Sequence, residues 1–235
     1  MGTQKVKEHE SEVQHYEMAV KFQQKSAEVF ALQIQGYNIA TKKLDDYMKN
    51  GYTNSSKQPA VVVDLDETVL NNMPFVAKGI EEGFDYTKWG SKWDDWVEAA
   101  CADTIPGSKE FLLHADELGV KIFYVSNRLM KSEKATILNL KKVGLPQVSK
   151  ETVLLWGDYG TKQARRASIR KDHEIVVLVG NSLYDLSSVF INEDTEEQIK
   201  TVEEYAEEFG DRFVILPNSS YGDYWVDAPL EAWDE

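Results

Sequence analysis

The sequence predicts an α/β protein, with a Rossmann-like parallel sheet covered by helices on both faces, a helical N-terminal extension and a small cap insertion. Short, continuous apolar runs recur along the chain, as expected of strands buried on both faces of a sheet. Helical patterns separate several of these runs, and strands that alternate with helices form parallel sheets. We expect the extension to cover residues 1–58 and the core residues 59–235, with the cap insertion at about 71–105.

The overall composition limits the classes of protein. The 235 residues suit one large domain, or a domain with an appendage, and 42% of them are hydrophobic, enough for a sizeable core. The formal net charge is −14, and such a surface repels the backbone of a nucleic-acid duplex, so no duplex partner is expected. Cys101 is the only cysteine, so no intrachain disulfide can form. No stretch is long and apolar enough to span a membrane.

The first part of the chain, from Val6 to Met48, lacks proline and has a helical pattern. We interpret it as an appendage that packs on the core rather than as a helix that binds a partner. Gly36 could divide it into two helices. Its apolar residues at helical spacing are Val29, Phe30, Leu32, Ile34, Tyr37, Ile39 and Leu44.

Five apolar runs are predicted to be the strands of the core: Ala60–Asp64, Val120–Val125, Val153–Trp156, Ile175–Val179 and Phe213–Leu216. Helices are predicted at Ser132–Val143, which Gly144 ends, and at Thr161–Lys171. A third, strongly acidic helix at Glu193–Glu208 is interpreted as a solvated face. Ligands of parallel sheets bind beyond the carboxyl ends of the strands, so the residues that follow each run are the candidate site.

The segment from Asn71 to Ile105 shows little strand alternation and is rich in aromatic residues. These residues are Phe75, Phe84, Tyr86, Trp89, Trp93 and Trp96. We interpret the segment as an insertion that lies over the carboxyl end of the first strand.

Polar and charged residues follow the predicted strands. Asp64 and Asp66 end the first strand, and two acids there are unfavourable unless they are paired or bound to a metal. Residues 126–128 follow the second strand, where a serine hydroxyl and backbone amides could hold a phosphate oxygen. Lys162 lies near a helix start beyond the third strand. Gly180 begins a polar turn after the fourth strand, which suggests close approach of the backbone to a ligand.

Carboxylates, a hydroxyl, a lysine and a polar turn at successive strand ends follow the order of the haloacid dehalogenase superfamily. Residues 62–72, VVDLDETVLNN, closely resemble the signature of class C acid phosphatases, bacterial lipoproteins that hydrolyse nucleoside monophosphates and other phosphomonoesters. Further segments resemble that family in the same order: Ile105–Gly107, Val125–Arg128, Lys162 with Arg165, and Leu216–Gly222.

This resemblance implies a magnesium-dependent phosphatase that forms an aspartyl-phosphate on Asp64. Asp66 would be the general acid and base, with its backbone carbonyl on the metal and its side chain free for proton transfer. Ser126 and the amide of Asn127 would bind the phosphoryl group, and Lys162 would add positive charge to the same oxygens.

The resemblance also implies a pocket for the leaving group, in which Trp93 and Tyr221 would stack on a base. Arg165 would either hold a carboxylate in place or lie at the surface. By the same resemblance, the native protein would be extracytoplasmic and anchored to the bacterial surface through a lipid, and this chain would be a soluble, truncated form. A homo-oligomer is compatible with the sequence.

The chain departs from the family pattern at Asn181, where the resemblance expects a metal-binding carboxylate. The predicted metal ligands are thus Asp64, Asp66 and Asn181, with Asp185 compensating directly or through water. Three explanations stay open: an engineered inactivating change, a natural variant that works at higher metal concentration, or a relic that binds phosphorylated ligands without turnover. The competing functions are therefore a phosphomonoesterase, a phosphotransferase on the same fold, and a protein that captures nucleotides.

Overall fold

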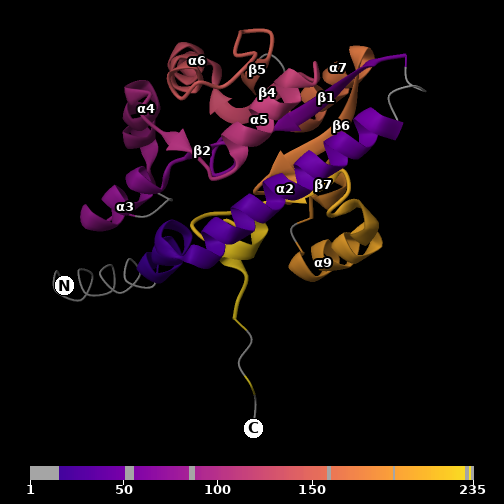
Figure 1. Cartoon of the computed structure of the whole chain (residues 1–235). Coiled ribbons are helices and arrows are strands. Elements are labelled where there is room, and N and C mark those ends of the chain that lie inside the picture. The colour runs from indigo at the N-terminus through magenta and orange to yellow at the C-terminus, as the bar shows by residue number, and fades with distance from the viewer. Residues whose placement is uncertain are drawn as a thin grey trace, which may run out of the picture.

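The computed structural model describes residues 16–50, 56–84, 88–157, 160–192, 194–230 and 233 (Figure 1). Five parallel strands form one sheet in the order β5-β4-β1-β6-β7. The strands are β1 (Gln58–Val63), β4 (Lys121–Leu129), β5 (Val153–Trp156), β6 (His173–Gly180) and β7 (Phe213–Ile215). All five predicted strands are confirmed, as is the parallel sheet. The predicted helix before residue 16, Tyr86, residues 158–159 and Glu193 lie outside the described residues.

Helices cover both faces of the sheet. One face carries α2 (Ala27–Asn50), α5 (Ser108–Glu117) and α6 (Glu133–Lys142), and the other carries α7 (Lys162–Asp172), α8 (Leu183–Leu186) and α9 (Thr195–Glu204). In Figure 1, α2 crosses in front of β6 and β7. Short 3₁₀ helices are η3 (Met130–Ser132), η4 (Ser188–Phe190), η5 (Ala206–Glu208) and η6 (Tyr224–Asp227).

The central strand β1 is buried on both faces because successive side chains point to opposite sides of a strand. Val61 and Val63 pack in the cluster that contains α2 and α5, and Ala60 and Val62 pack in the cluster that contains α7 and α8. This explains the unbroken apolar run that the sequence shows before Asp64. The end of β1 is thus held between two packed layers.

The helix α2 runs through Gly36, so the predicted break there is wrong. A Cβ atom at residue 36 would lie 2.5 Å from Cδ2 of Leu216, which shows that glycine allows α2 to approach the chain beyond β7. The interruption lies at Ser26 instead, after helical residues 16–25. The Ser26 hydroxyl accepts hydrogen bonds from the N–H groups of Glu28 and Val29, as an N-cap does.

The aromatic insertion forms α3 (Met73–Glu81) and α4 (Gly90–Ala99). It leaves and rejoins the core through an antiparallel pair of two-residue strands, β2 (Leu70–Asn71) and β3 (Asp103–Thr104). Tyr37 of α2 donates a hydrogen bond of 2.7 Å to the carbonyl of Thr68, in the loop after β1. Residues of α2 belong to the same hydrophobic cluster as the strands of the sheet. The boundary after residue 58, between a helical extension and the core, therefore stays a prediction.

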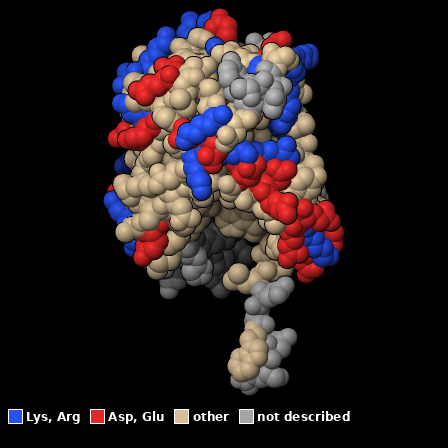
Figure 2. Space-filling model, turned by 45° about the vertical axis from the view of Figure 1, so that its right-hand side comes forward, with Lys and Arg blue, Asp and Glu red and all other residues tan. Residues whose placement is uncertain are grey.

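The acidic surface predicted from the composition is visible in the structure. Exposed glutamates cover α9 and η5, namely Glu196, Glu197, Glu203, Glu204 and Glu207. In Figure 2, acidic side chains gather at the lower right of the visible face. No helix in the described ranges is both long and apolar enough to cross a membrane.

Candidate active site

The carboxyl ends of β1, β4 and β6 face one pocket of about 280 Å³. Its described lining residues are Asp64, Asp66, Trp89, Trp93, Asn127, Arg128, Lys162, Asn181, Ser182, Tyr184, Asp185, Tyr221 and Asp223. The structure therefore brings together every predicted site residue except Ser126, which is buried beside the pocket. The Ser126 hydroxyl lies 3.3 Å from the carboxylate of Asp66, as a donor.

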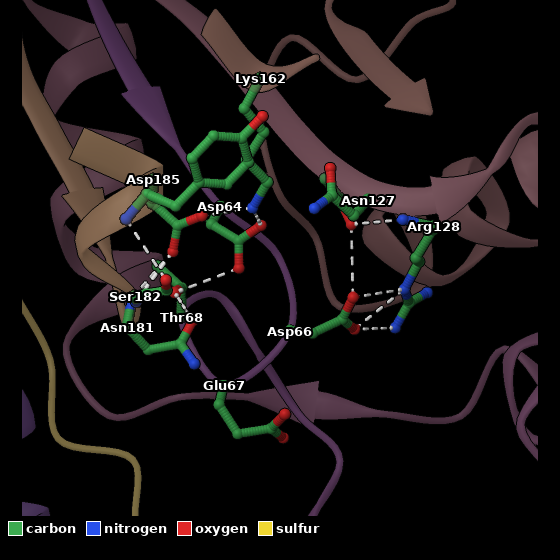
Figure 3. A network of polar contacts seen from close by, with 12 residues as sticks. Asp64, Asp66, Glu67, Thr68, Asn127, Arg128, Lys162, Asn181, Ser182 and Asp185 are labelled. Carbon is green, nitrogen blue, oxygen red and sulfur yellow. Dashed lines mark hydrogen bonds and ion pairs between the residues drawn. The ribbon is translucent and has the colours of Figure 1, made fainter. Parts of the chain in front are cut away.

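Three buried charges meet at the base of the pocket (Figure 3). Nζ of Lys162 donates to Oδ1 of Asp64 at 2.5 Å and also to Oδ1 of Asp185. Burial alone would lower the pKa of Lys162, but the charges of Asp185 and Asp64 outweigh it and raise the pKa above its ordinary value. Burial, opposed by Lys162, raises the pKa of Asp64 above its ordinary value. Lys162 therefore stays charged beside the carboxylate that the sequence singles out.

Local structure explains why Lys162 reaches this position. Lys162 is the first residue of α7, and the side chain of Thr161 caps the helix by accepting the N–H of Ala164 at 3.2 Å. The start of α7 therefore points its first side chain across the end of the sheet. This is the position that the sequence pattern indicated for Lys162.

Asp185 closes the turn after β6. Its Oδ2 accepts the N–H groups of Asn181 and Ser182 at 3.2 and 3.0 Å, while its Oδ1 accepts from Lys162. A Cβ atom at residue 180 would lie 2.3 Å from Cβ of Asp185, so Gly180 is needed for this approach. The sequence suggested that Gly180 approaches a ligand, whereas the group that it approaches is the Asp185 side chain.

Asn181 and Asp64 both lie beside the hydroxyl of Thr68. Oγ1 of Thr68 donates to Oδ1 of Asn181 at 3.0 Å and lies 3.4 Å from Oδ2 of Asp64. These oxygens, with the backbone carbonyl of Asp66, are the hard donors that Mg²⁺ prefers. In the described part of the chain, no three histidine, cysteine or carboxylate side chains form a group that could hold a metal. Oxygen donors with few carboxylates would suit Mg²⁺, which often keeps several waters, and the ligand set stays a prediction.

Arg128 is the site residue that the sequence reasoning missed. Its guanidinium donates from Nε at 2.9 Å and from Nη2 at 2.7 Å to Oδ1 of Asp66, and Nδ2 of Asn72 donates to the same oxygen at 2.9 Å. The side chain of Asp66 is therefore held at one side of the pocket (Figure 3), and its availability for proton transfer stays a prediction. The predicted strand ended at Val125, whereas β4 continues to Leu129 and so places Arg128 on the same side as Ser126.

Arg165 neither holds a carboxylate nor lies at the surface, so both interpretations of it are wrong. It is 1% exposed. Its Nη1 donates to the carbonyls of Ser126 and Leu154 at 2.6 and 2.9 Å, and its Nη2 donates to Oδ1 of Asn127 at 2.8 Å. Arg165 thus joins α7 to two strands. It also holds the side-chain amide of Asn127, which lines the pocket.

Glu67 links the loop after β1 to the cap and to the C-terminal segment. This fully buried carboxyl accepts the N–H of Asn72 at 2.7 Å and the hydroxyl of Tyr221. Burial and the charge of Asp66 raise the pKa of Glu67 to about 8, against the opposing hydrogen bonds from Tyr221 and Asn72. The sequence reasoning assigned no role to this residue, and one of its partners, Tyr221, is distant in the chain.

Aromatic rings form the outer wall. The rings of Trp89 and Trp93 stack with centroids 5.3 Å apart, and the edge of Tyr221 meets Trp89 at 5.4 Å. The guanidinium of Arg128 lies 5.6 Å from the centre of the Trp93 ring. The predicted pair, Trp93 and Tyr221, is therefore part of a larger wall that includes Trp89.

The chain belongs to the HAD (haloacid dehalogenase) superfamily. Within it, the chain belongs to the family of subfamily IIIB acid phosphatases, whose family model matches residues 2–224.

Solved structures agree with this family. The structure of the class C acid phosphatase from Bacillus anthracis matches with a TM-score of 0.84 and 39% identity, covering 90% of this chain and 87% of that one. The structure of a class C acid phosphatase from the same organism with tungstate bound matches with the same TM-score and coverage at 38% identity. The expected resemblance to class C acid phosphatases is thus confirmed.

Curated relatives match a shorter part. Vegetative storage protein 1 of Arabidopsis thaliana is 31% identical over 137 residues, which cover 53% of this chain and 48% of that protein. The chain spans about half the length of the curated relatives it matches.

Replacing Arg165 by Lys should destabilise the protein, because the three donors of a compact ammonium cannot serve the four acceptors that the guanidinium reaches, the fourth being the carbonyl of Thr161. Each buried acceptor left without a donor costs about 1–3 kcal/mol. We expect a lower midpoint of urea unfolding, measured by tryptophan fluorescence. The matched control is Arg170→Lys at an exposed position of the same helix; equal midpoints for the two variants would contradict the prediction.

The raised pKa of Glu67 should make stability depend on pH. In the folded state Glu67 keeps its proton until the pH approaches about 8. In the unfolded chain the same group loses its proton near its ordinary pKa of about 4.3. This contribution to stability is therefore lost as the pH rises from about 5 to 8, by up to about 1.4 kcal/mol per pH unit.

The test compares the chain with its Glu67→Gln variant, which keeps an oxygen acceptor and cannot titrate. We expect the unfolding free energy of the wild type, relative to the variant, to fall as the pH rises, measured in urea with a chelator present. A difference that is constant over this range would refute the assignment.

Proposed function

We propose that this chain is a metal-dependent acid phosphatase that hydrolyses phosphomonoesters, nucleoside monophosphates among them, through an aspartyl-phosphate on Asp64. The observation that carries the proposal is the ion pair of Lys162 with Asp64, buried at the base of a pocket with an aromatic wall. A carboxylate paired with a buried ammonium at the base of the pocket suits attack on the phosphorus of a monoester. Membership of the acid phosphatase family supports the same reaction.

In the proposed reaction, an oxygen of Asp64 bonds to phosphorus as the bond from phosphorus to the alcohol oxygen breaks. Asp66 gives a proton to the departing alcohol and then takes one from the water that attacks the aspartyl-phosphate, which releases phosphate and regenerates Asp64. Lys162 and the amide of Asn127 bind the phosphoryl oxygens, and the Ser126 hydroxyl orients Asp66 or the phosphoryl group. Arg128 and Asn72 hold the Asp66 carboxylate beside the leaving oxygen.

We propose that Mg²⁺ is bound by a carboxylate oxygen of Asp64, the carbonyl of Asp66 and the amide oxygen of Asn181. When bound, the ion offsets the negative charge of the phosphate dianion and so allows a carboxylate to approach it. The hydrogen bonds of Asp185 to Lys162 and to two backbone amides favour a positioning role for Asp185. A ligand role for Asp185 stays a prediction.

The pocket wall supports recognition of a flat leaving group. Trp93 and Tyr221, with Trp89, present ring surfaces at the pocket, and base stacking on such rings contributes about 1–3 kcal/mol per base. The hydrogen bond of Tyr221 to Glu67 holds that ring in place. Nucleoside monophosphates are therefore the first substrates to test.

A second candidate function is capture of phosphorylated ligands without turnover. Asn181 favours it, since a neutral ligand replaces the carboxylate that the family pattern expects and weakens the metal site. One relative is named a vegetative storage protein. By its resemblance to class C acid phosphatases, we also propose an extracytoplasmic, lipid-anchored native form; a homo-oligomer remains compatible with the chain.

Turnover separates the two functions. We expect release of p-nitrophenol from p-nitrophenyl phosphate with Mg²⁺, abolished by a chelator and reduced at least about 10³-fold in Asp64→Asn. The assay is run at mildly acidic pH, with nucleoside monophosphate binding measured in parallel. Binding of nucleotide without release of p-nitrophenol would reject the phosphatase function in favour of capture without turnover.

Restoring a carboxylate at residue 181 should strengthen the metal site. We expect Asn181→Asp to lower the Mg²⁺ concentration for half-maximal turnover by about tenfold or more, which corresponds to about 1.4 kcal/mol of binding free energy. Asn38→Asp, on the exposed face of α2, adds the same charge far from the pocket and serves as the control. Identical metal dependence in all three proteins would reject a ligand role for residue 181.

A further inference from the structure

Asp223 is a pocket residue that the proposed reaction does not use. It lines the same pocket as Asp64 and Lys162, but its side chain is exposed whereas theirs are buried. Its Oδ2 accepts the hydroxyl of Ser182 at 2.5 Å, in the turn that also carries Asp185. Asp223 therefore lies on the solvent side of the pocket, where the leaving group of a bound phosphomonoester would extend.

The neighbouring chain holds Asp223 in this position. Two residues earlier, the hydroxyl of Tyr221 is bonded to buried Glu67. A Cβ atom at residue 222 would lie 2.1 Å from Nε1 of Trp225, so the chain at Gly222 packs directly against that indole. Asp223 is thus held by the contacts of its own chain segment and by the hydrogen bond from Ser182 in the turn after β6.

The charge of Asp223 is not balanced within the described pocket lining. That lining contains two cations, Lys162 and Arg128, and both already pair with carboxylates at the base. No lysine or arginine of the described ranges forms an ion pair with Asp223. Its negative charge therefore acts on any group that extends from the phosphate toward solvent, since exposed charges interact over about 8–10 Å at moderate salt.

We propose that Asp223 is a specificity-determining residue that selects phosphomonoesters by the charge of the leaving group. Leaving groups with an ammonium are favoured, neutral ones are accepted, and those with a carboxylate or a second phosphate are disfavoured. The inference rests on the proposed phosphatase function and names the substrate class of that site. Asp223 would select the charge of the leaving group, whereas stacking on Trp93 and Tyr221 would select its flat shape.

The test uses three small esters that differ mainly in this charge: phosphoethanolamine, ethyl phosphate and phosphoglycolate. For the wild type, kcat/KM should decrease in that order at low salt. In Asp223→Asn, which can still accept the Ser182 hydroxyl, the ratio of phosphoethanolamine to phosphoglycolate should fall by about fivefold or more. In Asp223→Lys the order should reverse, and added salt should reduce all these differences.

The control is Asp172→Asn, the same change of charge at the other end of α7, about 15 Å along the helix from Lys162. An unchanged ratio in both Asp223 variants, or an equal change in the Asp172 control, would overturn the inference while phosphatase activity persists. If no ester is turned over, the proposed function fails instead. The same ratio is then taken from dissociation constants measured by tryptophan fluorescence, and equal affinities in wild type and variants would overturn the inference.

Discussion

The buried ion pairs of Lys162 with Asp64 and Asp185 are the constraint on which the rest of the site depends. Charges removed from water are tolerated only when each has a partner in good geometry, and loss of one partner leaves another uncompensated. Three separate parts of the chain must therefore end at one point: the loop after β1, the start of α7 and the turn after β6. Gly180 makes this possible, because any side chain there would collide with Asp185.

The helix α7 transmits this constraint to the neighbouring strands. One turn after Lys162, Arg165 donates to the carbonyls of Ser126 and Leu154 and to the side chain of Asn127, so it joins β4 and β5 to the helix. Arg166 donates to the carbonyl of Asp185 at 2.7 Å, and burial lowers its pKa to about 10. Hydrogen bonds from buried guanidinium groups thus position the groups around the pocket.

A second network connects the site to the segments above it. Asn72 begins the cap, bonds to both Asp66 and Glu67, and accepts the indole N–H of Trp96 at 2.8 Å. Glu67 in turn accepts the hydroxyl of Tyr221 from the C-terminal segment. Asp66, the acid proposed for proton transfer, therefore belongs to the same hydrogen-bond network as the residues that hold the aromatic wall. A substitution in the cap should for this reason affect Asp66.

The sequence by itself determined the α/β class, the five strands and the positions of Asp64, Asp66 and Lys162, because buried strands and strand-end acids leave local signals. It did not reveal the pairing of Arg128 with Asp66, the acceptors of Arg165 or the bond from Tyr221 to Glu67. Gly36 was interpreted as a helix break because propensity is local, whereas its role is close packing against Leu216. Only the tertiary structure decides such contacts, since the partners are brought together by the folding of the whole chain and leave no periodic pattern in either segment.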